Sequence, residues 1–190
     1  MDRLSDNYYV EQVLSGETDA FSFLLNKYSR QVFSLIVRMV GNREDAEELT
    51  QDVFIKAYRS LPQFRGDSSF STWIYRIAYN IAVSATRKRK PETVPIDDNI
   101  LSNVPDEPDD AFLENTDASM RVFYLNRALE RLTPEERSMI VLFYKDNRSM
   151  DEIAKITGLT ETNVKTKIFR IRKKLYVWIK SMEKETYETE

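Results

Sequence analysis

The sequence predicts an all-α protein of two small helical modules joined by a flexible acidic linker. Apolar residues recur at helical spacing through most of the 190-residue chain, and no convincing hairpin turn interrupts them. Only four glycines occur, and four of the six prolines fall within residues 91–108. A proline-containing acidic segment does not form a packed core, so we expect it to separate two folded modules.

Charge is distributed unevenly along the chain. The formal net charge is −3, but residues 1–90 carry +2, residues 91–118 carry nine acids and no base, and residues 119–190 carry +4. We therefore expect a first module over 1–90, a linker over 91–118, a second module over 119–182 and a polar tail over 183–190. Both modules are mildly basic, so the acidic total does not exclude nucleic-acid binding.

Residue types that are missing exclude several classes of chemistry. The chain has no cysteine and no histidine. Disulfides, thiolate or imidazole zinc sites and histidine-based catalytic triads are therefore excluded, and no cofactor is expected. No glycine-rich phosphate loop, signal segment or membrane-spanning apolar run is found, which fits a cytoplasmic protein.

Helical periodicity predicts four helices in the first module, over residues 7–15, 19–40, 43–60 and about 69–88. Gly41 is expected to end the second helix and Asn42 to cap the third. Pro62 and a polar loop precede the fourth. The second helix has the clearest apolar stripe. Its members are Phe21, Leu24, Leu25, Tyr28, Val32, Leu35, Ile36 and Met39.

Start signals for helices are strong in the second module. Leu125, Ala128, Leu129 and Leu132 are expected to form its first apolar face. Residues 133–136 read Thr-Pro-Glu-Glu, and residues 149–152 begin with serine and end with glutamate; both are capping-box patterns. A last helix is expected to run from about residue 160 to about residue 182.

Residues 150–169 have the pattern of a helix-turn-helix. Ile153, Leu159, Val164 and Ile168 are placed to bury one helix against the other, and Gly158 permits the turn. The second helix should display a basic face that can enter a major groove. Its members are Lys165, Thr166, Lys167, Arg170, Arg172, Lys173 and Lys174. The alternative is a solvated basic face on a small helical bundle.

An aromatic and basic segment spans residues 64–81. Phe70, Trp73, Ile74, Ile77 and Ile81 have the spacing of a helical core. That spacing leaves Tyr75, Arg76, Tyr79 and Asn80 on other faces. Rings beside a polar loop suit single-stranded nucleic acid, because any base can stack on them. Core packing and nucleic-acid binding both remain open from these residues alone.

Acidic side chains gather on the helix over 44–59. Asp45, Glu48 and Asp52 share one side of it. A solvated face, a protein-docking face and a carboxylate metal site are the three interpretations, and the first needs no special partner.

Three blocks in this order resemble the extracytoplasmic-function (ECF) group of bacterial RNA polymerase sigma factors. They are DAEELTQDVFIKAYRSLPQFRGDSSFSTWIYRIAYN, the acidic linker, and LTPEERSMIVLFYKDNRSMDEIAKITGLTETNVKTKIFRIRKKL. The resemblance covers nearly the whole chain, and the first block is the most specific. It implies sigma regions 2 and 4, an alternative sigma factor that brings polymerase to promoters, and no enzymatic activity.

The resemblance also implies roles for residues. The residues that it implies dock on the clamp helices of the polymerase beta-prime subunit are Glu48, Leu49, Gln51, Asp52, Phe54, Ile55 and Lys56. Binding of the −10 non-template strand falls to Phe64, Arg65, Asp67, Ser68, Ser69, Trp73, Arg76 and Asn80. Reading of the −35 element falls to Lys165, Thr166, Lys167, Phe169, Arg170 and Arg172.

Further partners implied by the resemblance are the polymerase beta flap and an anti-sigma factor, and the factor would act at the nucleoid. Two other functions are alternatives to this one. A stand-alone helix-turn-helix regulator would need no polymerase-docking helix, and a carboxylate metal enzyme would need a bound divalent ion.

Overall fold

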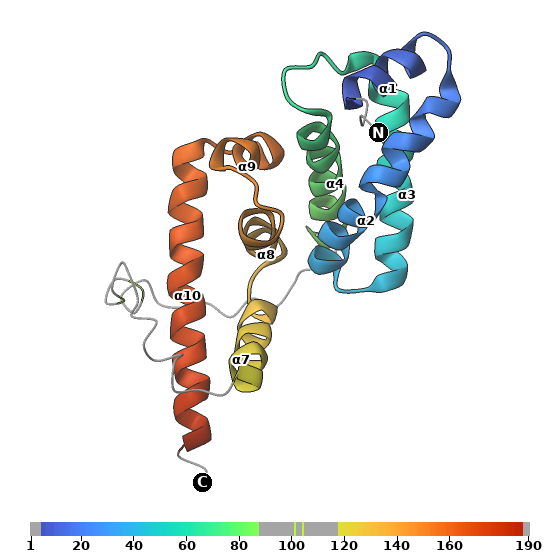
Figure 1. The fold of residues 1–190 in the computed structure, drawn as a ribbon. Coiled ribbons are helices and arrows are strands. Elements are labelled where there is room, and N and C mark those ends of the chain that lie inside the picture. The colour runs from blue at the N-terminus through green and yellow to red at the C-terminus, as the bar shows by residue number, and fades with distance from the viewer. Residues whose placement is uncertain (1–4, 88–100, 102–103, 105–117, 188–190) are drawn as a thin grey trace.

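A computed structural model describes residues 5–87, 101, 104 and 118–187, and those residues form an all-helical structure with no strand (Figure 1). In the first module the helices are α1 (Asp6–Leu14), α2 (Phe21–Val40), α3 (Arg43–Ser60) and α4 (Phe70–Arg87). In the second they are α7 (Ala118–Glu130), α8 (Pro134–Ile140), α9 (Met150–Thr157) and α10 (Glu161–Tyr187). The predicted fold class is confirmed. Most of the expected linker lies outside the described residues.

Helix α2 is the centre of the first module, packed against α1, α3 and α4. Leu24, Val32, Leu35 and Ile36 of its predicted stripe are fully buried. Leu25 departs from the prediction, because 38% of it is exposed. It lies at the edge of the stripe and lines the groove between α2 and α3. The buried face of α2 is therefore narrower than the apolar stripe in the sequence.

Local capping sets the helix ends as expected. Gly41 has φ of +74°, the left-handed conformation that ends α2. The Asn42 side chain accepts a hydrogen bond from the Asp45 N–H at 3.0 Å and so starts α3. Pro62 falls in a short 3₁₀ turn (Leu61–Gln63) between α3 and the polar loop. Backbone conformation and hydrogen-bonding geometry therefore explain these boundaries without tertiary contacts.

Both predicted capping boxes are present in the second module, at Thr133 and at Ser149. Helix α8 continues as a π-helical segment (Val141–Lys145) that the sequence did not reveal. Helix α10 runs to Tyr187 rather than ending near Met182, and so includes much of the expected tail. Ala128 and Leu132 of the predicted α7 face are buried, but Leu125 is 43% exposed and Tyr124, at 5% exposure, packs inward in its place.

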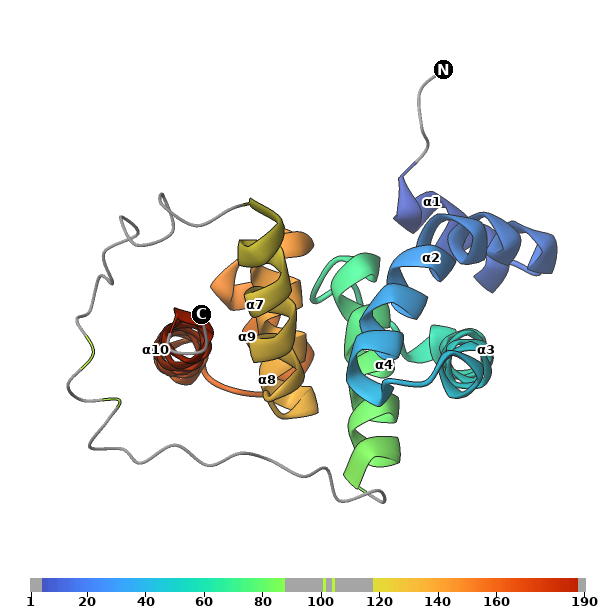
Figure 2. The same ribbon diagram turned by 90° about the horizontal axis from the view of Figure 1, so that it is seen from below.

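The two modules pack directly against each other. Helix α9 packs against α4, and α8 packs against α2. Figure 2 shows the helices of the second module beside those of the first. Tyr75 and Tyr79 are 1% and 7% exposed. The sequence predicts that both tyrosines lie outside the core of the first module. They are nevertheless buried in the complete chain. The second module covers them.

Candidate nucleic-acid and polymerase interfaces

A pocket of about 400 Å³ opens beside the loop that precedes α4. Its walls combine one aromatic ring with charged and polar side chains. They are Gln63, Arg65, Asp67, Ser68, Thr72, Trp73, Arg76 and Lys155. The arginines can neutralise phosphates, the ring can stack on a base, and the hydroxyl and carboxylate groups can pair with a base edge. The pocket therefore has the chemistry needed to hold one unpaired nucleotide.

Local structure holds the pocket wall in place. Ser69 caps α4, because its Oγ accepts from the Thr72 N–H at 3.1 Å and its carbonyl accepts from the Trp73 N–H at 3.1 Å. Gly66 has φ of +76°, which turns the loop back toward the helix. Trp73 is half-buried, with its ring centroid 5.2 Å from that of Phe64 and 5.6 Å from that of Phe70. The aromatic cluster fixes the tryptophan and leaves part of it on the surface.

A second hollow, of about 860 Å³, lies between α2 and α3. Gln51 and Ile55 of the acidic α3 face line it, and the apolar side chains of Leu25 and Tyr58 adjoin them. Ile55 is 49% exposed and Tyr58 is 42% exposed. Of the predicted docking residues on α3, Leu49 is half-buried and Phe54 is a core residue at 5% exposure. The others are exposed: Glu48, Gln51, Asp52, Ile55 and Lys56. An apolar groove with a polar rim is typical of a protein-docking surface.

The helix-turn-helix forms as predicted by α9, the turn at Gly158 and the start of α10. Gly158 has φ of +76°. Thr160 caps α10, because its Oγ1 accepts from the Asn163 N–H at 3.2 Å. Ile153 and Val164 are fully buried between the two helices. The exposed face of α10 carries Lys165, Thr166, Lys167, Arg170 and Arg172, and Phe169 is half-buried beside it.

Two of the lysines predicted on that face turn inward instead. Lys173 is 8% exposed, and its Nζ lies 4.6 Å from the centre of the Phe169 ring. Lys174 forms an ion pair of 2.7 Å with Glu136 on α8. Both side chains hold α10 in the module, so the basic groups available to DNA are fewer than the run of charges implies.

Family models match both modules: Sigma-70 region 2 over residues 24–92, and Sigma-70 region 4 over residues 123–175. The ECF RNA polymerase sigma factor SigW of Bacillus subtilis is 32% identical over 186 residues, covering 87% of this chain and 92% of the relative. The ECF RNA polymerase sigma-E factor of Escherichia coli K12 is 35% identical over 177 residues, covering 90% and 92%. The chain belongs to the ECF sigma factors.

Solved structures agree with this assignment. CnrH, in complex with the cytosolic domain of CnrY, matches with a TM-score of 0.65 and 25% identity over 93% of this chain and 97% of that chain. The sigma factor RpoE of Bartonella quintana, in complex with the anti-sigma factor NepR, shares the fold with a TM-score of 0.61 at 21% identity, covering 85% and 98%. This ECF sigma factor is a transcription initiation factor that binds core RNA polymerase and directs it to promoter DNA. The matches span both modules, so a stand-alone regulator is not favoured.

The residues predicted to bind the −10 strand lie in three different positions relative to the pocket. Arg65, Asp67, Ser68, Trp73 and Arg76 line the pocket. Phe64 and Ser69 support it from behind, through ring packing and helix capping. Asn80 is exposed further along α4 and does not line the pocket.

Three pocket residues were missed by sequence reasoning: Gln63, Thr72 and Lys155. Gln63 and Thr72 are near neighbours of predicted site residues, and Thr72 follows the Ser69 cap by three positions. Sequence could have suggested both. Lys155 comes from α9 of the other module, and only the tertiary structure brings it there.

Within the described ranges, no group of three or more acidic residues is arranged to hold a metal ion, including those on α3. None of the helices there combines the length and the apolar character needed to cross a bilayer.

Proposed function

We propose that the pocket beside Trp73 receives one unpaired base of the −10 non-template strand. The observation that carries this proposal is the composition of its wall: a half-exposed tryptophan, two arginines and a set of short polar side chains around about 400 Å³. Unstacking a base costs a few kcal/mol, and stacking on an aromatic ring returns roughly 1–3 kcal/mol. Capture of a flipped base can therefore support promoter opening without an external energy source.

The other two surfaces fit the remaining contacts of a sigma factor. We assign the exposed face of α3 and the adjoining α2–α3 groove to docking on the beta-prime clamp helices. The basic face of α10 is assigned to the −35 element, with Lys165, Lys167 and Arg170 as its central cations. The second module would also meet the beta flap. The chain thus contributes binding only, and the chemistry of RNA synthesis belongs to the polymerase.

An anti-sigma factor is a further partner in this proposal. The matching RpoE structure is that of a sigma factor in complex with an anti-sigma factor. The present chain shares its fold along most of its length. The same surfaces that serve polymerase and promoter are then available to such an inhibitor, with the factor acting in the cytoplasm at the nucleoid.

Reconstituted transcription tests the pocket. Purified protein and core polymerase are first incubated with a library of genomic fragments, and promoters are identified from transcript 5′ ends. Each −10 non-template position is then replaced by 2-aminopurine, whose fluorescence rises when it unstacks. Stacking on the indole quenches the probe, so we expect one position to stay dark while its melted neighbours brighten. Trp73→Ala should brighten that position and lower transcription by roughly tenfold or more, matching loss of one stacking contact.

Arg30→Ala is the matched control for Arg76→Ala. Both remove an exposed arginine from the first module, but Arg30 lies on α2 and does not line the pocket. Only Arg76→Ala should weaken opening. Absence of a specific transcript from every fragment would contradict the sigma function itself. Normal 2-aminopurine signals in Trp73→Ala would contradict the pocket assignment alone.

A further inference from the structure

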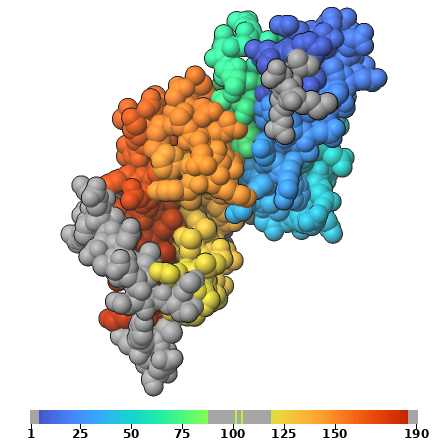
Figure 3. All heavy atoms as spheres, in the orientation of Figure 1, coloured from blue at the N-terminus to red at the C-terminus, as the bar shows by residue number. Residues whose placement is uncertain are grey.

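The pocket beside Trp73 is formed by both modules. Its lining comes from the first module except for Lys155, which belongs to α9 of the second. With the modules packed the pocket still measures about 400 Å³, so α9 adds a wall and leaves the space open. In Figure 3 the orange surface of the second module abuts the green and blue surface of the first. A small ligand in this pocket would therefore touch both modules.

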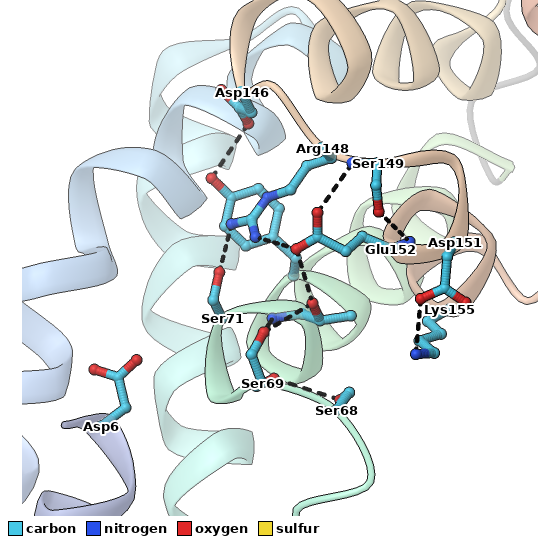
Figure 4. Close-up of polar contacts among 12 residues, drawn as sticks. Asp6, Ser68, Ser69, Ser71, Asp146, Arg148, Ser149, Asp151, Glu152 and Lys155 are labelled. Atoms are coloured by element: carbon cyan, nitrogen blue, oxygen red, sulfur yellow. Dashed lines mark hydrogen bonds and ion pairs between the residues drawn. The ribbon is translucent and has the colours of Figure 1, made fainter.

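Polar contacts hold Lys155 at the pocket. Arg148, which comes just before α9, donates to Ser71 Oγ on α4. Glu152 accepts from Arg148 Nη1 at 2.9 Å and from Thr72 Oγ1 at 3.4 Å. Figure 4 shows these contacts, with Lys155 beyond them on α9. The first turn of α9 is thus fixed against α4, and the lysine that follows it by one turn is placed in the pocket wall.

Positive charge is in excess around the pocket. Arg65 and Arg76 are exposed in its wall, and neither has an ion-pair or hydrogen-bond partner among the residues that the structure describes. Lys155 pairs with Asp151 at 2.8 Å, which leaves two of its three N–H donors available. Asp67 is the acid among the lining residues. Even with Asp151 counted, the cations outnumber the acids, which favours an anionic ligand.

An aromatic ring beside unpaired cations has the chemistry to bind a nucleotide. The half-exposed Trp73 ring offers a face on which a base can stack, and the two arginines can donate charge-assisted hydrogen bonds to a phosphate. Gln63 and Asp67 can pair with a base edge. Ligand pockets measure roughly 300–1,000 Å³, so a pocket at the small end of that range suits one nucleotide rather than a strand.

We propose that the free sigma factor binds a nucleoside 5′-monophosphate in this pocket, with the base on Trp73 and the phosphate held by the arginines and Lys155. Binding there rests on the proposed function of the pocket, because the same ring and arginines would receive the −10 base. Lys155 belongs to the site only while the modules are packed. The nucleotide therefore stabilises that packing by mass action, and it occupies the space that the −10 base would enter.

Calorimetric titration of the full-length protein tests binding. The probes are AMP, GMP, CMP and UMP, with adenosine and inorganic phosphate titrated separately. We expect at least one monophosphate to bind with a Kd on the order of 10–100 µM, as its size allows. Adenosine and phosphate should each bind about tenfold more weakly or worse, because each makes only part of the contacts. No binding of any monophosphate at about 1 mM would overturn the proposal.

Tryptophan fluorescence locates the bound nucleotide. The chain has two tryptophans, so Trp178→Phe leaves Trp73 as the only one. A base stacked on the indole quenches its emission, and the quenching should follow the Kd measured by calorimetry. Trp73→Ala in the parent chain is an independent check and should weaken binding by about tenfold. Binding that neither quenches Trp73 nor responds to Trp73→Ala would lie elsewhere and would overturn the proposal.

Lys155→Gln tests the contribution of the second module. Loss of one charged donor should weaken monophosphate binding by about fivefold or more and leave the weak binding of adenosine unchanged. Lys180→Gln is the matched control, because Lys180 also pairs within its own helix, with Glu183, and does not line the pocket. Equal monophosphate affinity of Lys155→Gln and the parent would overturn a site shared by both modules.

Single-stranded DNA separates a free nucleotide from one within a strand. Fluorescein-labelled decamers of random sequence are titrated alongside, by fluorescence anisotropy. If Trp73→Ala weakens decamer binding but no monophosphate binds, the pocket takes only a strand: the −10 assignment stands and the nucleotide site does not. If monophosphates quench Trp73 while Trp73→Ala leaves the promoter 2-aminopurine signals unchanged, the nucleotide site stands and the −10 assignment is wrong.

Discussion

Several side chains at the contact between modules serve two structures at once. Glu152 completes the cap of α9 and also accepts from Arg148 and Thr72. Burial raises the pKa of Tyr75 to about 12, and the nearby Asp146 carboxylate adds to that shift. The phenol therefore stays protonated at neutral pH and can donate to Asp146. These residues couple local helix structure to the packing of the whole chain.

The Glu152 carboxyl should make this coupling sensitive to acid. Burial by itself would raise its pKa, but the hydrogen bond from the Ser149 backbone and the Arg148 guanidinium hold it below its ordinary value. A lowered folded-state pKa stabilises the fold at neutral pH, and that stabilisation disappears as pH falls through the folded-state value. The relevant window is therefore below about pH 4.3, the ordinary value for glutamate.

Glu152→Gln tests this prediction. The amide keeps an acceptor for Thr72 but carries no charge. At pH 7 we expect the variant to lose about 1 kcal/mol of unfolding free energy, measured by urea denaturation, and at about pH 3 the loss should be smaller. Asp151→Asn is the control, because that carboxylate pairs with Lys155 within α9 and is itself exposed. An equal loss at both pH values would show that charge is not the cause.

At the scale of elements, the helix-turn-helix depends on one backbone conformation. Gly158 adopts φ of +76°, and a Cβ at that position would meet no atom within 4 Å. Any cost of substitution there is therefore strain in the backbone rather than a clash. The π-helical segment before Arg148 is the contrasting case, because its geometry positions Arg148 but has no clear signal in residues 141–145.

Gly158→Ala should destabilise the second module by about 1–2 kcal/mol, the cost of a left-handed conformation for an L-residue. Gly158→Asn should cost less, because asparagine tolerates that conformation. Thermal unfolding of the purified chain measures both. Equal stability of the alanine variant and the parent would mean that the turn relaxes to another conformation.

At the scale of the whole molecule, the three proposed contact surfaces, one for polymerase and two for promoter DNA, lie on separate parts of the fold. The proposed docking face is on α3, the pocket lies at the start of α4, and the basic face is on α10. Packing of α9 on α4 affects the second of these directly.

Charge reversal on α3 tests the proposed docking face. Asp52→Lys should weaken binding to core polymerase by roughly tenfold or more, because it places a like or unpaired charge in a docking interface. Glu47→Lys is the matched control on another face of the same helix, where the parent residue pairs with Arg43 at 2.9 Å. Binding can be followed by fluorescence anisotropy of labelled protein. Equal effects of both variants would indicate a general charge effect.

The helices, their caps and the two-module division could all be predicted from the sequence, because they depend on periodicity and on interactions within a few residues. Gly41, Asn42, Ser149 and Gly158 all act in this local way. The resemblance to sigma factors supplied most of the pocket residues, since they fall in one contiguous segment.

The contact between the two modules could not be predicted from the sequence and is seen only in the tertiary structure. Tyr75 and Tyr79 are buried by residues distant in sequence, and Lys155 enters a pocket built by the other module. Lys173 and Lys174 resemble DNA-facing cations in sequence but are held by Phe169 and Glu136. Helical spacing reports which face of a helix is apolar. It does not report which second surface will cover the rest, because that depends on contacts between segments that share no local pattern.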